Sequence, residues 1–325
     1  MTGAPHAGVP VREDGILCCD VGRDRYAFRS RDIRHVERAE YVRVDRGESK
    51  RRGTLKLGGQ HVPVFALGEV LGGASSDSGA NCFTGHVAVT GERGALVGWL
   101  VDRIARAADP GSANIAALPP ILGAPATSWF EGIVRLGDDE SALLIAPHLL
   151  ASGAPRAEGR EAEPVFARPR PTPVVDPEPV VVVFSTTVLP ASAASRYALS
   201  GRQIAAIVQS TDPIAVPGCS DRVRGVMWWR RTVVPVIDFR SAADGTVTPH
   251  RRRLIVQCGA RQHGALIALS IDSEVVMCRP AADHRLLPAV PCPPFASGVF
   301  DINGEPVALL DVDALLAADP RTVAS

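Results

Sequence analysis

The sequence predicts a mainly β protein made of two tandem copies of one domain. Three observations lead to this prediction. Four sequence blocks recur in the same order, the apolar runs are short and β-branched, and a Pro-rich stretch divides the 325 residues near the middle. A chain of this length is expected to form about two domains. Each half is long enough to bury a core of its own.

The recurring blocks align the first half of the chain with the second at a separation of about 170 residues. Such a separation, repeated four times in one order, indicates a tandem duplication. The matched blocks are Arg25-Tyr26-Ala27-Phe28 with Arg196-Tyr197-Ala198-Leu199; Gly53 and Val62-Pro63-Val64 with Gly225 and Val234-Pro235-Val236; Gly94-Ala95-Leu96 with Gly264-Ala265-Leu266; and Gly132 and Ala142-Leu143-Leu144 with Gly298 and Ala308-Leu309-Leu310.

Within each copy the apolar runs have the length and composition of strands. In the second copy strands are expected at 233–239, 254–257, 265–271 and 299–310, the last containing an Asn303-Gly304 hairpin turn. Pro235 inside the first of these runs predicts an edge strand or a bulge.

Helices are expected mainly at the ends of the two copies. Asp311 or Asp313 can N-cap a helix over 314–318, which stops before Pro320. The segment 147–153 is expected to be the matching element, closed by Gly153.

These elements set the expected domain boundaries. Residues 1–14 are expected to be a flexible N-terminus, 15–151 the first domain, 180–318 the second domain and 319–325 a tail. Residues 152–179 contain seven prolines, which disfavour regular pairing, so this segment is predicted to be a semi-stiff linker.

Charge and composition exclude several classes of protein. Lys+Arg and Asp+Glu are balanced at 35 each, which argues against a sequence-independent nucleic-acid binder and against a polybasic membrane anchor. No apolar run approaches the roughly 20 residues of a spanning helix, so no direct membrane insertion is expected. The first residues do not resemble a secretory signal. The seven cysteines form no regular framework, which favours free thiols in a cytoplasmic protein.

Catalytic patterns are weak, so no enzyme, cofactor or metal site is expected. Cys219 or Ser220 could pair with His250 and Asp238, but there is no nucleophile elbow around them. There is no H-E-x-x-H, P-loop or G-x-G-x-x-G motif, and Asp311-Val312-Asp313 fits a helix cap better than a calcium loop. The basic run 250–253 is expected to be a solvated loop, with nucleic-acid binding as the alternative.

The segment 223–240, with the sequence VRGVMWWRRTVVPVIDFR, resembles the signature of the CheW family of bacterial chemosensory adaptors. The family pattern there is roughly Gly-Val-Ile-Asn-Leu-Arg-Gly-x-Val-Val-Pro-Val-Ile-Asp-Leu-Arg. The resemblance extends over nearly all of 180–318, and the first copy follows the same outline more weakly over 15–151. Trp228 stands where the family usually has Asn, Arg231 where it has Gly, and Gly58 takes the place of the family arginine in the first copy.

This resemblance implies two small five-stranded SH3-like barrels per domain, with a short C-terminal helix. It implies a non-enzymatic scaffold that couples the cytoplasmic tips of chemoreceptors to the regulatory domain of a CheA-type histidine kinase. Other CheW-like proteins are further candidate partners. The expected location is the cytoplasm, with recruitment to membrane-associated receptor arrays. The alternative is a CheW-like fold recruited as a nucleic-acid-binding or other protein-binding module outside chemotaxis.

Five residues of the second copy are predicted to bind partners: Ile204, Trp228, Arg230, Val233 and Val234. Arg230 matches the family arginine; its alternative is a structural role at backbone carbonyls. Ile204 has the spacing of an apolar receptor contact, with plain barrel core as its alternative. Val233 and Val234 point to opposite faces, so one is expected in the core and the other at a groove. Trp228 is an interface anchor if it faces outward, and core otherwise.

Overall fold

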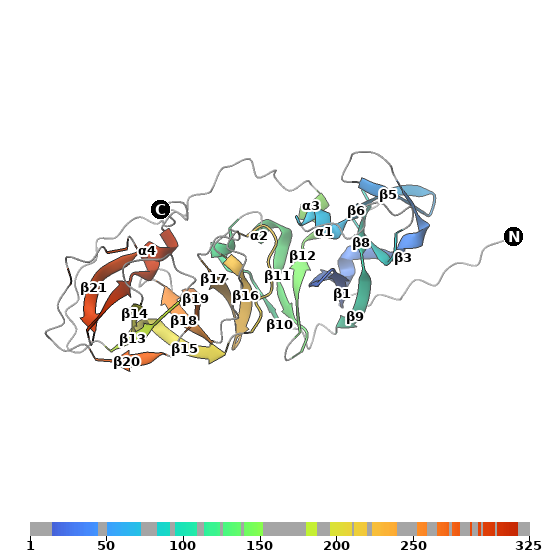
Figure 1. Ribbon diagram of the computed structural model, residues 1–325. Helices are drawn as coiled ribbons and strands as arrows, with labels where there is room; N and C mark the ends of the chain where they lie inside the picture. The colour runs from blue at the N-terminus through green and yellow to red at the C-terminus, as the bar shows by residue number, and fades with distance from the viewer. Residues whose placement is uncertain are drawn as a thin grey trace. The chain divides into compact units, whose positions relative to one another are not determined.

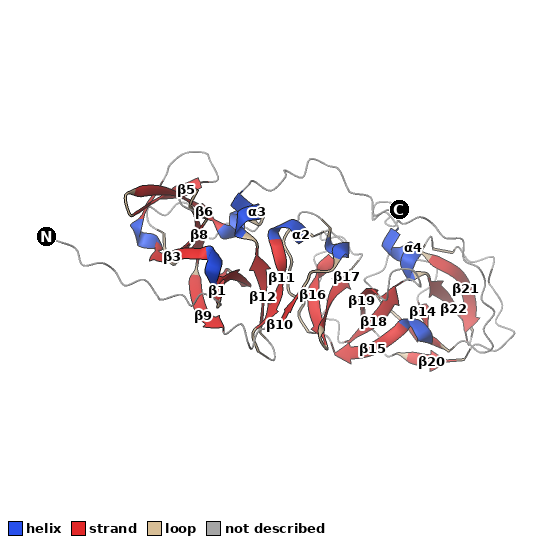
Figure 2. Cartoon of the chain, turned by 180° about the vertical axis from the view of Figure 1, so that it is seen from behind, coloured by secondary structure: helices blue, strands red, loops and turns tan. Residues whose placement is uncertain are grey.

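The computed structural model describes the parts of the chain that form the strands and short helices (Figure 1). The described residues are 15–44, 51–72, 83–91, 95–108, 114–123, 126–137, 140–151, 180–186, 196–209, 211–219, 223–238, 252–258, 265–272, 275–279, 287, 292–293, 295–302 and 304–317. The expected N-terminus 1–14, linker 152–179 and tail 319–325 therefore lie outside them, as do His250, Arg251 and Gly153. Figure 2 shows that strands dominate, as expected for a mainly β chain.

The described residues fall mainly into one unit from the first half of the chain and one from the second. The first unit has two sheets, with strand orders β10-β11-β12-β2-β1-β9 and β3-β7-β8-β6-β5-β4. Its elements are β1 Ile16–Val21, β2 Asp24–Arg29, β3 Ile33–Arg38, β4 Val42–Val44, β5 Arg51–Leu57, β6 Gln60–Ala66, α1 Leu67–Val70, β7 His86–Thr90, β8 Val97–Val101, β9 Arg103–Ala108, β10 Asn114–Ala116, α2 Ala126–Trp129, β11 Phe130–Arg135, β12 Ser141–Ile145 and α3 Pro147–Ala151.

The second unit repeats this plan with the strand orders β20-β13-β14-β22-β21 and β15-β18-β19-β17-β16. Its elements are β13 Val181–Phe184, β14 Arg196–Ser200, β15 Ile204–Gln209, β16 Val223–Trp229, β17 Thr232–Ile237, β18 Arg252–Cys258, β19 Ala265–Ile271, β20 Val276–Cys278, β21 Ala296–Ile302, β22 Glu305–Leu310 and α4 Val312–Ala317.

The five strands of each second-unit sheet have counterparts in the same order in a first-unit sheet, which confirms the duplication. Each unit contains the same antiparallel hairpins and the same two parallel pairs: β12 with β2 and β6 with β8 in the first, β14 with β22 and β17 with β19 in the second. Each second-unit sheet has the expected five strands. Each first-unit sheet has a sixth, three-residue strand, β4 or β10. At the place of β10, the second unit has a backbone hydrogen bond from Leu287 to Val299.

Two of the repeated glycine positions lie at β-bulges in both units, which explains their recurrence. The register shifts next to Gly53 in β5 and next to Gly132 in β11, and again at Gly225 and Gly298 in the second unit. A Cβ on Gly132 would lie 2.4 Å from the carbonyl oxygen of Ala116 on the neighbouring strand. The bulge lies in the β11–β12 pair, and on the other side of β11 the backbone of β10 comes this close, so only glycine fits there without a shift.

The fourth repeated block is corrected by one residue in the structure. Gly132 pairs with Leu144, and its counterpart Gly298 pairs with Leu309, so Leu144 corresponds to Leu309 and not to Leu310. The two hairpins differ in length: β11 and β12 are joined after the pair Arg135–Ser141, whereas β21 and β22 turn tightly through Gly304. The pairing of Ile302 with Glu305 confirms the expected tight hairpin, and Asn303 itself lies outside the described residues.

Pro235 lies in β17, which is flanked by β16 and β19, so the prediction of an edge strand is wrong. The bulge lies beside it, where the register shifts between Val223 and Gly225. In an antiparallel hairpin, hydrogen-bonded and non-hydrogen-bonded pairs alternate from the turn, which makes Val226–Pro235 a non-hydrogen-bonded pair. On the other side of β17, the parallel pairing with β19 begins only at Val236. Proline is tolerated here because neither neighbouring strand requires its missing N–H.

The C-terminal helix α4 begins after Asp311, whose side chain accepts a hydrogen bond from the Ala314 amide at 3.0 Å. Asp311 is therefore the N-cap, and Asp313 lies inside the first turn. In the part of the chain that the structure describes, no helix has the length and apolar character needed to span a membrane.

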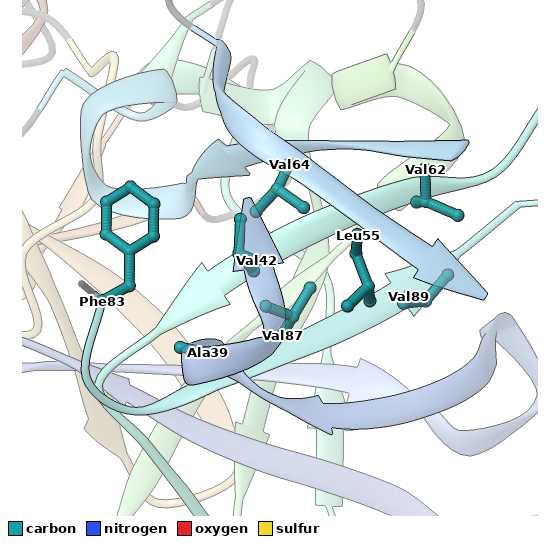
Figure 3. Close-up of a cluster of buried hydrophobic side chains, with 8 residues drawn as sticks. All are labelled: Ala39, Val42, Leu55, Val62, Val64, Phe83, Val87 and Val89. Carbon is teal, nitrogen blue, oxygen red and sulfur yellow. The ribbon is translucent and has the colours of Figure 1, made fainter. Parts of the chain in front are cut away.

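The interior of each small sheet is an apolar cluster. In the first unit, Val42, Leu55 and Val62 come from the neighbouring strands β4, β5 and β6 and point into one cluster with Val87 and Val89 (Figure 3). Alternation along a strand then sends the residues between them to the opposite face. This placement decides which side chains can meet a partner.

Candidate partner-binding site

Four of the five predicted partner-binding residues lie in one hairpin, formed by β16 and β17. Trp229 pairs with Thr232, so Arg230 and Arg231 form a two-residue turn. Arg230 has φ 56°, in the left-handed region that glycine usually occupies in such turns. The hairpin therefore presents an exposed arginine at its tip.

Arg230 is held over its neighbour. Its guanidinium carbon lies 4.6 Å from the centroid of the Trp229 ring, which is a cation–π contact. Trp229 is half-buried and packs against the apolar cluster formed by Met227, Val234, Val236, Ile255 and Ala268. Trp229 was not among the residues predicted to bind partners, although it is one of two adjacent tryptophans, which point to opposite faces of a strand.

Trp228 and Val233 lie directly opposite each other across the hairpin and share one face of the sheet. Trp228 is half-buried with its indole N–H buried and unpaired, and Val233 is 6% exposed. Val234 points to the other face and is fully buried in the core cluster. The expectation that either Val233 or Val234 is an open groove residue is therefore not met, because both sides of β17 are covered.

Ile204 begins β15, which is the first strand of the sheet order that ends in β16. A register shift after Ile204 places it opposite Val256, whereas Ala206 lies opposite Ile255. Followed across the sheet, these pairs put Ile204 and Ile207 on the same face as Trp228 and Val233. Ile204 is half-buried, whereas Ile207 is 44% exposed and is a further contact candidate that was not predicted from the sequence.

The basic run contains a buried arginine, which corrects the prediction of a solvated loop. Arg252 and Arg253 belong to β18, and Arg253 is only 4% exposed. Its guanidinium donates to the Thr211 carbonyl and lies 3.8 Å from the Met227 sulfur, while its Nε has no partner. Burial lowers the pKa of Arg253, and the charge of Asp212 opposes this. Arg253 is therefore unavailable to a nucleic acid.

Asp238, considered above for catalysis, is buried and bonded to Arg224 at 3.0 Å. Arg52 of the first unit, on the corresponding strand, pairs with Glu69 in the same way. The carboxylate of Asp238 thus forms an ion pair that stabilises the fold. Among the described residues no cluster of His, Cys, Asp and Glu has the arrangement of a metal site.

The corresponding hairpin of the first unit is chemically different. Its turn is Gly58-Gly59, with φ values of 54° and 85°, and the pair opposite each other is Lys56–His61. Both side chains are exposed. The apolar pair Trp228–Val233 of the second unit is therefore replaced by two basic groups at the same place in the fold.

A family model described as the CheW-like domain matches residues 15–154 and again residues 188–319. The chain belongs to the CheW-like domain family. Both CheW-like copies are thus matched separately, although Gly58 replaces the family arginine in the first.

One solved structure similar to this tandem CheW-like chain is the scaffolding protein TtCheW from Thermoanaerobacter tengcongensis. The two share 20% sequence identity over 43% of this chain and 92% of TtCheW, with a TM-score of 0.35. The comparison with curated proteins gave no match.

Proposed function

We propose that the protein is a non-enzymatic scaffold of a chemosensory array. Its second CheW-like domain couples cytoplasmic chemoreceptor tips to the regulatory domain of a CheA-type histidine kinase. The observation that carries the proposal is the separate match of both copies to the CheW-like domain. The protein would act in the cytoplasm, at membrane-associated arrays, and other CheW-like proteins are further candidate partners.

The kinase contact is assigned to the tip of the β16–β17 hairpin. Arg230 is exposed there, and its stacking on Trp229 reduces the conformational freedom that it would lose on binding. An arginine fork can bind carboxylate or carbonyl partners with defined geometry. The hairpin thus offers a preorganised polar contact.

The receptor contact is assigned to the face that carries Ile204, Ile207 and Trp228. An amphipathic helix binds a groove through apolar anchors at helical spacing. Ile207 supplies exposed apolar surface on this face, and Ile204 lies beside it on the same strand. Val233 and Val234 support the hairpin from inside instead of contacting the partner.

The alternative of a nucleic-acid-binding module has no support in the described residues. Arg253 is buried, and the chain carries no net charge. A protein that binds phosphates needs exposed cations in excess.

The test is a binding measurement on the full chain by biolayer interferometry. The ligands are the kinase regulatory domain and a receptor-tip fragment from the same organism. Arg230→Gly is expected to weaken kinase binding at least tenfold and Ile207→Asp to weaken receptor binding, while Arg23→Ala, at an exposed turn of the first unit, changes neither. Failure of the wild-type chain to bind either partner would overturn the proposal.

A further inference from the structure

The outer face of β4, β5 and β6 in the first unit carries a cationic patch, formed by Arg43, Lys56 and His61. Arg43 pairs with Thr54 across β4 and β5, and Lys56 pairs with His61 across β5 and β6. Thr54 and Lys56 are two residues apart on β5, so all four side chains share one face. Arg43, Lys56 and His61 are exposed, whereas Val42, Leu55 and Val62 on the other face are buried (Figure 3).

No acidic residue balances this patch within its own strands. The sequences of β4, β5 and β6 contain four Lys or Arg residues and no Asp or Glu. Arg52 is already paired with Glu69. Within the described ranges, Arg43 and Lys56 have no ion-pair partner.

The hairpin turn leaves the patch open. Gly58 and Gly59 have no side chains, and a Cβ built on either would meet nothing within 4 Å. In the second unit the same turn is Arg230-Arg231, and the pair corresponding to Lys56–His61 is the apolar Trp228–Val233. The two copies have therefore diverged at one surface from apolar to cationic.

We propose that the cationic patch of the first CheW-like copy binds an acidic protein segment. An extended segment with a carboxylate at every second residue places charges roughly 7 Å apart. Arg43 on β4 and Lys56 on β5 are diagonal neighbours in the β4–β5 pair, and such positions lie about 7–8 Å apart. Complementary charge thus matches the patch in sign and spacing.

A nucleic acid fits the patch less well than a carboxylate segment. Arg43 and Lys56, on a chain with zero net charge, would release few counterions from a duplex. The proposal is independent of the function assigned to the second copy, because it concerns a different unit and a different chemistry.

The test uses fluorescence anisotropy of a fluorescein-labelled twelve-residue peptide of alternating Glu and Ser, titrated with the full chain. The same peptide with Gln in place of Glu is the neutral probe. A labelled DNA duplex and vesicles containing phosphatidylserine are the other anionic probes. The variant is Arg43→Glu with Lys56→Glu. Its matched control, Arg23→Glu with Arg31→Glu, makes the same change in net charge at two exposed arginines of the first unit.

We expect the Glu peptide to bind, with an affinity that falls as salt is added, and the Gln peptide not to bind. The patch variant is expected to weaken binding at least tenfold and the control by less than threefold. A second variant, Arg43→Gln with Lys56→Gln, should also weaken binding, and its unchanged thermal unfolding midpoint would show that the fold is intact. Absence of peptide binding, equal losses in patch and control variants, or binding of only the duplex or the vesicles would overturn the proposal.

Discussion

The guanidinium of Arg230 lies over the ring of Trp229, 4.6 Å from its centroid, at the turn of the β16–β17 hairpin. The contact joins adjacent residues, one of which has left-handed backbone geometry. The backbone of Arg230 is thus held in a conformation that is unfavourable for any residue with a Cβ. The first unit has Gly58 at the same place, with φ 54°.

Arg230→Gly is expected to separate stability from binding. Glycine removes a left-handed penalty of about 1 kcal/mol, and the lost cation–π contact costs about 0.5–1 kcal/mol. The free energy of unfolding should therefore change by less than about 1 kcal/mol in urea titrations, although kinase binding falls. A large loss of stability would show that Arg230 has a structural role instead.

Gly132→Ala is expected to destabilise the protein by about 1–3 kcal/mol, because the new Cβ would meet the Ala116 carbonyl oxygen at 2.4 Å. Gly137→Ala is the matched control, since its Cβ would meet nothing within 4 Å. Chemical denaturation of both variants measures the difference. Equal stabilities would mean that β10 moves away from β11 at little cost.

Arg253→Met is expected to leave the free energy of unfolding unchanged, or to raise it by up to about 2 kcal/mol. Methionine fills similar space and removes a buried cation whose Nε has no partner. Arg253→Ala should instead cost about 2–4 kcal/mol, because it leaves a cavity. If the methionine variant were as unstable as the alanine variant, the hydrogen bond to the Thr211 carbonyl would be the dominant contribution.

Stability is expected to fall as the pH rises above about 9. Burial raises the pKa of the Cys18 thiol from 9.0 to about 11 and that of Cys258 to about 12. Between pH 9 and the raised pKa of each thiol, that thiol loses its proton in the unfolded chain and keeps it in the folded chain. The slope of the unfolding free energy is therefore negative, about 1.4 kcal/mol per pH unit for each thiol. This contribution is fully present below pH 9 and is lost as the pH rises through 11 to 12.

Urea titrations at pH 7.5, 9 and 10 measure this slope. Cys258→Ala should reduce it, whereas Cys292→Ala, at an exposed position, should not. An unchanged slope in Cys258→Ala would contradict the assignment to that thiol.

The strands of the second copy were predicted well because their β-branched runs are short and their turns carry local signals. The run 265–271 is β19, and β21 and β22 form the expected hairpin. Pro235 was misplaced because the need for its missing N–H depends on which strands flank β17, and that is a non-local property. Arg253 was misread for a related reason: a basic run is locally polar, and only the packing of Met227 and the 211–212 segment buries one member of it.

The sequence alone determined the mainly β class, the duplication and the CheW-like family, because these depend on repeated residue patterns along the chain. The tertiary structure decided which of the selected residues can meet a partner. Val233 and Val234 are both covered, Arg230 is exposed at a turn, and Ile204 joins the face of Trp228 only through a register shift in β15. It also showed that Arg43, Lys56 and His61 form one patch, because strand register, and not sequence spacing, brings them onto the same face.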